Sequence, residues 1–122
     1  MQALMFTQPE KMAMQEVPTP QATAGQVLLQ IEAVGICGSD LHIYNAGDAF
    51  GFIQGQRLGH EFIGTVEEVG PGCTRFAPGD RVLASCSVLD GSCTYCHEDL
   101  ASSCVNWSLF GWAGRVWAHG GD

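Results

Sequence analysis

The segment QVLLQIEAVGI, residues 26–36, is the clearest β-strand pattern in the chain. It is long and rich in aliphatic and β-branched side chains, which fit a pleated and half-buried surface. The segment SDLHIYNA, residues 39–46, predicts a short helix with Ser39 as its N-cap and Gly47 at its end. The sequence therefore predicts a junction between a strand and a helix at Cys37.

Further short strands are predicted on both sides of this junction, separated by glycine and proline turns, at residues 1–7, 12–17, 60–69 and 81–84. Residues 90–104 are polar and rich in cysteine, and they predict a loop without core periodicity. Many short strands with such turns are typical of a small, barrel-like domain. The predicted fold class is mainly β with short helices.

Composition limits the classes of partner and of compartment. The chain has 122 residues and a mass of 13.0 kDa, a size that suits one domain. Its net charge of −8 disfavours nucleic acid and anionic membranes as partners. We find neither a signal peptide pattern nor an apolar run of membrane-spanning length. These features predict a cytoplasmic protein.

Three of the six cysteines, Cys93, Cys96 and Cys104, lie within twelve residues. A Cys-x-x-Cys pair with a third cysteine nearby, in a chain without a secretory signal, favours a metal site over disulfides. No Gly-x-Gly-x-x-Gly motif follows any predicted strand. The sequence therefore predicts no dinucleotide-binding unit.

Two motifs, CGSDLH at residues 37–42 and GHE at residues 59–61, resemble the zinc-dependent medium-chain alcohol dehydrogenases. The resemblance continues through Gly64, Val66, Val69-Gly70, the turn at residues 79–82 and the cysteine-rich lobe. It implies a GroES-like, partly open β-barrel with a zinc-binding lobe at residues 90–104. Residues 1–122 would form an incomplete catalytic domain, truncated before the family's Rossmann domain.

The resemblance implies that Cys37 and His60 are ligands of a catalytic zinc ion, with Glu61 as an alternate ligand. Adjacent residues of a regular strand point to opposite faces, so Glu61 joins the metal side only if the backbone turns at Gly59. Without such a turn, Glu61 is a solvated charge on a strand.

The resemblance also assigns Ser39 and His42 to a proton relay, since residues three apart share one face of a helix. Asp40 matches a carboxylate that orients the metal-binding histidine.

The lobe resembles a structural zinc site whose four ligands are cysteines in the family. Here Cys93, Cys96 and Cys104 match, and Asp90 stands at the first position. A carboxylate oxygen binds zinc at about 2.0–2.2 Å and sulfur at about 2.3 Å, so the replacement is feasible. If Asp90 cannot reach the ion, His97 or Cys86 are the substitutes.

The family reaction is hydride transfer between an alcohol and NAD or NADP. This chain ends before the family's third catalytic zinc ligand. His119 is one candidate to replace that ligand, although a histidine in a tail is more often simply exposed. Because nothing in the chain resembles a nucleotide site, we expect it to be inactive alone. The alternatives are a stand-alone zinc-binding interaction module and a partner chain that supplies the nucleotide domain. Uncovered strand edges and Trp107, Trp112 and Trp117 also predict a homo-oligomer.

Overall fold

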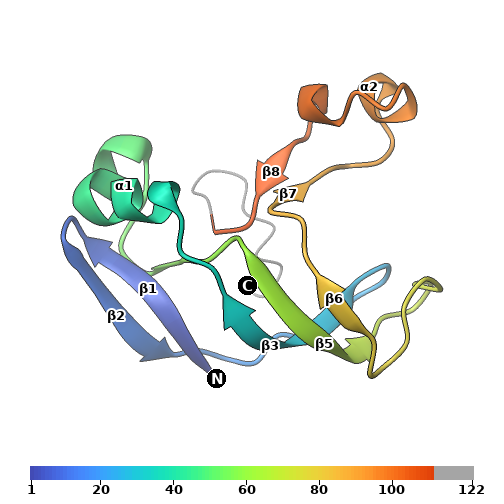
Figure 1. The fold of residues 1–122 in the computed structure, drawn as a ribbon, viewed down its shortest axis with the longest axis horizontal. Coiled ribbons are helices and arrows are strands. Elements are labelled where there is room, and N and C mark those ends of the chain that lie inside the picture. The colour runs from blue at the N-terminus through green and yellow to red at the C-terminus, as the bar shows by residue number, and fades with distance from the viewer. Residues whose placement is uncertain (112–122) are drawn as a thin grey trace.

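The computed structural model of the chain describes residues 1–111 and is mainly β with two short α-helices. Figure 1 shows the elements in chain order. They are β1 Gln2–Gln8, β2 Lys11–Glu16, β3 Val27–Val34, α1 Gly38–Ala46, the 3₁₀ turn η1 Gly47–Phe50, β4 Gln56–Arg57, β5 Phe62–Val69, β6 Arg81–Leu83, β7 Ser87–Val88, α2 Thr94–His97, the 3₁₀ turn η2 Ala101–Ser103 and β8 Ser108–Leu109. The predicted fold class is confirmed.

In the described part of the chain, the strands form three antiparallel sheets. Strands β2, β1 and β4 form the first sheet, β3, β5 and β6 the second, and β7 with β8 the third. The longest pairing joins β3 to β5, from Val27 opposite Val69 to Val34 opposite Phe62. This pairing brings the end of β3 beside the start of β5, and the residues just outside both ends therefore meet.

A small aromatic and aliphatic core holds α1 against the first sheet. Phe6, Ile43 and Phe52 are buried together, and the rings of Phe6 and Phe52 meet edge to face with centroids 6.0 Å apart. At Gly47, a Cβ atom would lie 2.8 Å from the Phe6 ring, so glycine is required there for packing. The core therefore fixes the position of α1 and, with it, of Cys37 at its N-terminal end.

Helix α1 begins earlier than the sequence pattern predicts. Its N-cap is Cys37, not Ser39, because the Asp40 carboxylate accepts a hydrogen bond from the Cys37 N–H at 2.9 Å. The predicted end at Gly47 is confirmed. Ser39 thus lies inside the first turn, where its hydroxyl is available for contacts with other side chains.

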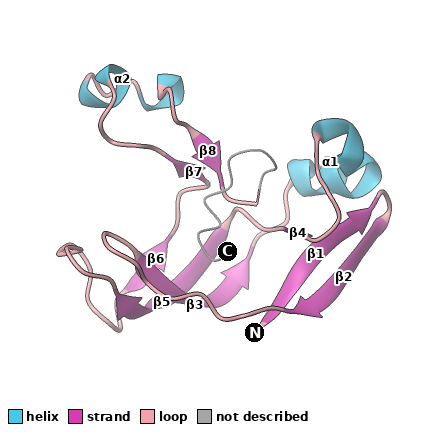
Figure 2. Cartoon of the chain, turned by 180° about the vertical axis from the view of Figure 1, so that it is seen from behind, coloured by secondary structure: helices cyan, strands magenta, loops and turns pink. Residues whose placement is uncertain are grey.

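The lobe, residues 90–104, extends away from the two larger sheets between β7 and β8 (Figure 2). The sequence predicted a loop here, whereas the structure forms α2 and η2 within it. These elements are three and four residues long, too short to give the sequence a helical period. Pairing of Ser87 with Leu109 and of Val88 with Ser108 closes the base of the lobe.

Trp112, Trp117 and His119 lie outside the described residues. Among the described residues, no helix has the length and apolar character needed to cross a bilayer.

Candidate metal centres

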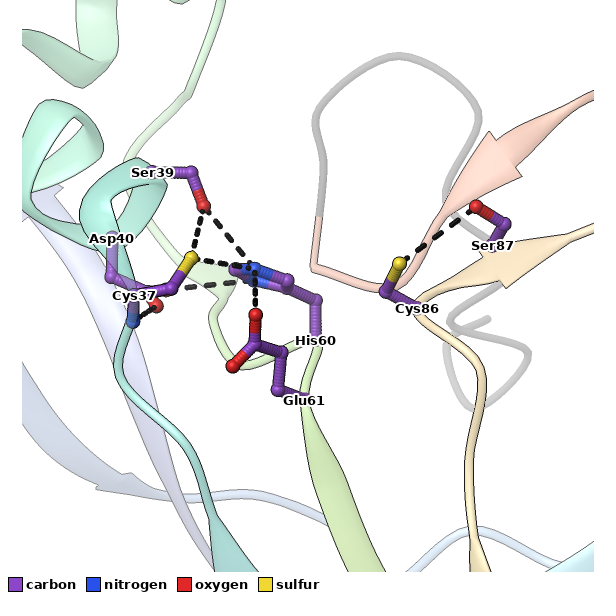
Figure 3. Close-up of polar contacts among 7 residues, drawn as sticks. All are labelled: Cys37, Ser39, Asp40, His60, Glu61, Cys86 and Ser87. Atoms are coloured by element: carbon purple, nitrogen blue, oxygen red, sulfur yellow. Dashed lines mark hydrogen bonds and ion pairs between the residues drawn. The ribbon is translucent and has the colours of Figure 1, made fainter. Parts of the chain in front are cut away.

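The structure brings Cys37, His60 and Glu61 together in what we call the junction cluster. Cys37 lies at the N-terminal end of α1, and His60 and Glu61 immediately precede β5. Their potential ligand atoms all lie within 4.8 Å of one another. Figure 3 shows the Cys37 Sγ atom directed at the His60 Nε2 atom, 3.2 Å away. A thiolate, an imidazole and a carboxylate suit zinc chemically.

Glu61 shares the metal side because the backbone turns before β5 begins. Gly59 has φ of +101°, a conformation that favours glycine, and neither His60 nor Glu61 lies within the strand. The rule of opposite faces therefore does not apply, and the Glu61 Oε1 atom lies 3.9 Å from His60 Nε2. Gly35 leaves the necessary room, since a Cβ atom there would lie 2.9 Å from Glu61 Oε2.

Asp40 lies on the other side of the His60 ring. Its Oδ1 atom is 3.6 Å from His60 Nδ1, and its Oδ2 atom accepts the Cys37 N–H. A carboxylate facing Nδ1 favours the tautomer with the proton on Nδ1 and leaves the Nε2 lone pair directed at Cys37 and Glu61. Because His60 is buried, with 7% of its surface exposed, its ring orientation is well defined.

Ser39 belongs to the same site. Its hydroxyl lies 2.9 Å from Cys37 Sγ and 3.2 Å from His60 Nε2. His42, one turn further along α1, is exposed, and no hydrogen bond within residues 1–111 joins it to Ser39. The structure thus brings Ser39 into the cluster, while the relay to His42 remains a prediction.

The second group, the lobe cluster, comprises Asp90, Cys93, Cys96 and Cys104. Its ligand atoms also lie within 4.8 Å of one another, and Cys104 is buried. Three sulfur atoms and one carboxylate match the donors of a closed, four-coordinate zinc site. Neither Cys86 nor His97 joins a group of three or more ligands among residues 1–111. Figure 3 shows Cys86 beside Ser87, across from His60.

Asp90 is held as an ionised carboxylate. Its Oδ1 atom accepts the backbone N–H groups of Ser92 at 2.8 Å and Cys93 at 3.0 Å, and its Oδ2 atom accepts the side-chain N–H of Asn106 at 2.7 Å. These bonds hold the pKa of Asp90 well below its usual range, with the Ser92 N–H as the main cause. An anionic oxygen is therefore available to a cation at any physiological pH.

The thiols of the lobe differ from one another in proton affinity. Burial raises the pKa of Cys96 to about 12, whereas the backbone N–H groups of Val105 and Cys96 lower the pKa of Cys93. In the metal-free chain Cys96 is consequently a protonated thiol at neutral pH. A metal ion that binds there must displace this proton.

Two features of these sites have no counterpart in the sequence analysis. Asn106, which bonds to Asp90, follows Cys104 by two residues and carries no recognisable motif. Gly111 packs on Gly59, where a Cβ atom on Gly111 would lie 3.0 Å from the Gly59 carbonyl oxygen. Contacts of this kind depend on tertiary packing, and neither periodicity nor spacing along the chain reveals them.

The fold is mainly β, and both clusters offer donor atoms that could hold a zinc ion. Residues 23–121 match the family described as the alcohol dehydrogenase GroES-like domain, and the chain belongs to this family.

Known proteins of this kind are similar over most of the chain. The medium chain reductase/dehydrogenase ucsI of Acremonium is 36% identical over 115 residues, covering 91% of this chain and 38% of its own length. The L-threonine 3-dehydrogenase of Thermococcus kodakarensis is 38% identical, covering 91% of this chain and 33% of its own. The solved alcohol dehydrogenase TADH of Thermus superimposes with a TM-score of 0.87 at 35% identity, covering 93% of this chain and 33% of that one. The chain thus spans about a third of the length of these relatives.

Proposed function

We propose that the chain is the zinc-binding catalytic domain of an alcohol dehydrogenase-like oxidoreductase. In this proposal Cys37, His60 and Glu61 hold the catalytic ion, and the lobe cluster holds a structural ion. The main support is the junction cluster together with its neighbour Ser39, because Cys37 Sγ, Ser39 Oγ and His60 Nε2 lie within 3.2 Å of one another. The three ligands of the junction cluster match the number that catalytic zinc sites take from the protein, and the four ligands of the lobe cluster match a structural zinc site.

Zinc bound at the junction cluster would supply a Lewis acid that polarises the oxygen of an alcohol. Asp40 keeps the His60 ring in the orientation and tautomer that present Nε2 to the ion. The Ser39 hydroxyl, beside two of the ligands, accepts the proton that the substrate alcohol loses. His42 is the proposed next acceptor, and its exposure on α1 gives that proton a route to solvent.

The nicotinamide, NAD or NADP, belongs to the complete enzyme in this proposal. The chain has no Gly-x-Gly-x-x-Gly motif and spans about a third of its relatives, so a nucleotide domain has to come from further sequence or from a partner chain. We therefore propose that residues 1–122 form an incomplete domain that is inactive alone, and that the protein functions in the cytoplasm. Its net charge of −8 disfavours nucleic acid and anionic membranes as partners.

The second candidate function is a zinc-binding interaction module without enzymatic activity. Its support is the apolar surface, since Ile36, Ile53 and Leu83 are each more than two-thirds exposed, at 82%, 71% and 79%. Exposed apolar side chains of this size are typical of surfaces that other protein segments cover. An interaction module would need the lobe cluster for its stability but would have no need of Ser39.

The test is a search for alcohol oxidation by the zinc-loaded chain with NAD and with NADP, across primary and secondary alcohols. We expect no reduced nicotinamide from the chain alone, because hydride transfer requires a cofactor held against the substrate. We expect activity when the remaining part of a zinc-type relative, with its nucleotide-binding domain and its third zinc ligand, is fused after residue 122. We expect loss of that activity in Ser39→Ala and His60→Ala. A folded, zinc-loaded fusion without any activity would favour the interaction module. Turnover by the unfused chain would show that it holds a cofactor site.

A further inference from the structure

As a metal ligand, Asp90 has to be oriented by its surroundings, whereas a cysteine at this position would not. A thiolate offers one donor atom, whereas a carboxylate has two oxygens and turns about the bond that joins it to Cβ. The oxygen that faces the three sulfur atoms is defined only if this rotation is restrained. A hydrogen bond restrains this rotation only elastically, so a donor on the second oxygen narrows it further than donors on one oxygen alone.

The structure provides restraints on both oxygens, from different parts of the lobe. The backbone N–H groups of Ser92 and Cys93 hold Oδ1, as in an ordinary turn that an aspartate closes. The side chain of Asn106 holds Oδ2 at 2.7 Å, from a position sixteen residues further along the chain. Asn106 is itself positioned by a turn in which the Trp107 N–H donates to the Cys104 carbonyl at 3.2 Å.

These three donors leave room for a metal ion. A carboxylate has about four lone-pair positions, and the donors occupy three of them. The carboxylate also hydrogen-bonds to the Cys96 side chain and offers a ligand atom within 4.8 Å of all three sulfur atoms, so its remaining position lies on the side of the cluster.

We propose that Asn106 is the positioning residue that orients Asp90 as the fourth ligand of the lobe cluster. This inference rests on the proposed structural metal site. The N–H groups of Ser92 and Cys93 close the turn at Asp90 and restrain its carboxylate from one side. The Asn106 side chain restrains it from the other side and so narrows the directions in which the ligand oxygen can point. Asn106 does not contact the ion, and its effect is transmitted entirely through Asp90.

The test is a double-mutant cycle on zinc affinity, measured by competition with a chelating dye on the full 122-residue chain. Asn106→Ala should lower zinc affinity by about 10-fold, the low end of the range for partners of metal ligands, because this hydrogen bond is exposed. In an Asp90→Cys background the same substitution should change affinity by less than about 2-fold, since a thiolate has no plane to orient. Asn45→Ala is the matched control, as Asn45 is the other asparagine of the chain and is exposed on α1. It should leave the affinity unchanged.

Cobalt substitution gives a second measurement that does not require the Asp90→Cys chain to fold. In Asn106→Ala the sulfur-to-cobalt charge-transfer band should keep its intensity, because the three thiolates remain. The visible d–d bands should shift as the oxygen ligand loses its fixed orientation. Unchanged d–d bands, or an equal loss of zinc affinity in both backgrounds, would overturn the proposal and make Asn106 part of the lobe's general structure.

Failure of the underlying metal site gives a different result. If Cys93→Ala removes no zinc from the chain, the structural site is refuted, and the role of Asn106 is refuted with it. Zinc binding that depends on Cys93 but not on Asn106 would refute the role of Asn106 alone.

Discussion

The junction cluster and the lobe cluster have similar ligands but are built in different ways. The junction cluster joins residues more than twenty positions apart, and it depends on the β3–β5 pairing and on the core beneath α1. The lobe cluster takes all its ligands from residues 90–104, a segment in which Cys104 is the one buried residue. The first site is therefore formed by the fold, whereas the second must itself hold its segment together. This difference predicts which site needs metal for its structure.

The largest effect should come from removing a lobe ligand. We expect the purified chain to hold about one tightly bound zinc, and Cys93→Ala to lose nearly all of it, because four ligands close in sequence bind more tightly than three. Elemental analysis of wild type, Cys93→Ala and Cys37→Ala measures the stoichiometry. Cys37→Ala serves as the control and should retain the lobe zinc. If Cys37→Ala loses the zinc and Cys93→Ala keeps it, the two sites are reversed.

A substitution in the core under α1 should impair metal binding at the junction cluster and spare the lobe cluster. Phe6→Ala removes a fully buried ring from the core under α1 and should lower the free energy of unfolding by about 3–5 kcal/mol. It should also weaken cobalt binding at the junction cluster, because Cys37 is positioned by α1, while zinc in the lobe is retained. Denaturant unfolding and cobalt titration measure the two effects.

An exposed and equally apolar residue supplies the control for that experiment. Leu83→Ala removes a side chain that is 79% exposed and should leave both quantities nearly unchanged. Loss of lobe zinc in Phe6→Ala would contradict the independence of the two sites.

The pH dependence of zinc release tests the lobe chemistry. The pKa of Cys96 is raised to about 12, so zinc must displace its proton throughout the neutral range. Affinity should therefore fall as pH falls, by up to about 10-fold per pH unit for each proton displaced. Asp90 adds nothing to this slope near neutrality, because its lowered pKa keeps it ionised. Dye competition between pH 6 and pH 8 measures the slope, and a pH-independent affinity would contradict cysteine ligation.

The motifs at residues 37–42 and 59–61 predicted the class of fold and the residues that the structure gathers at the junction. Ligand residues carry recognisable spacing because each must present one atom at one point. The N-cap at Cys37 was not predicted, since it depends on the Asp40 side chain. The position of Glu61 was left open between two alternatives, and the turn at Gly59 decides between them. The contacts of Asn106 and Gly111 were not predictable, because they join segments that have no periodic relation.

Self-association is the smallest of the expected effects, and it concerns surface outside both clusters. Seventeen large hydrophobic residues among the described residues are exposed, including Trp107 at 43%, against six hydrophobic residues that are buried. Unpaired strand edges and apolar side chains recruit further chains, at about 25 cal/mol per Å² of apolar area covered. The net charge of −8 opposes association, but salt screens it over about 8–10 Å. We expect a dimer by light scattering at micromolar concentration, and a weakened one in Trp107→Ala. A single 13.0 kDa species in wild type would contradict this prediction, and it would leave both metal centres as they are proposed.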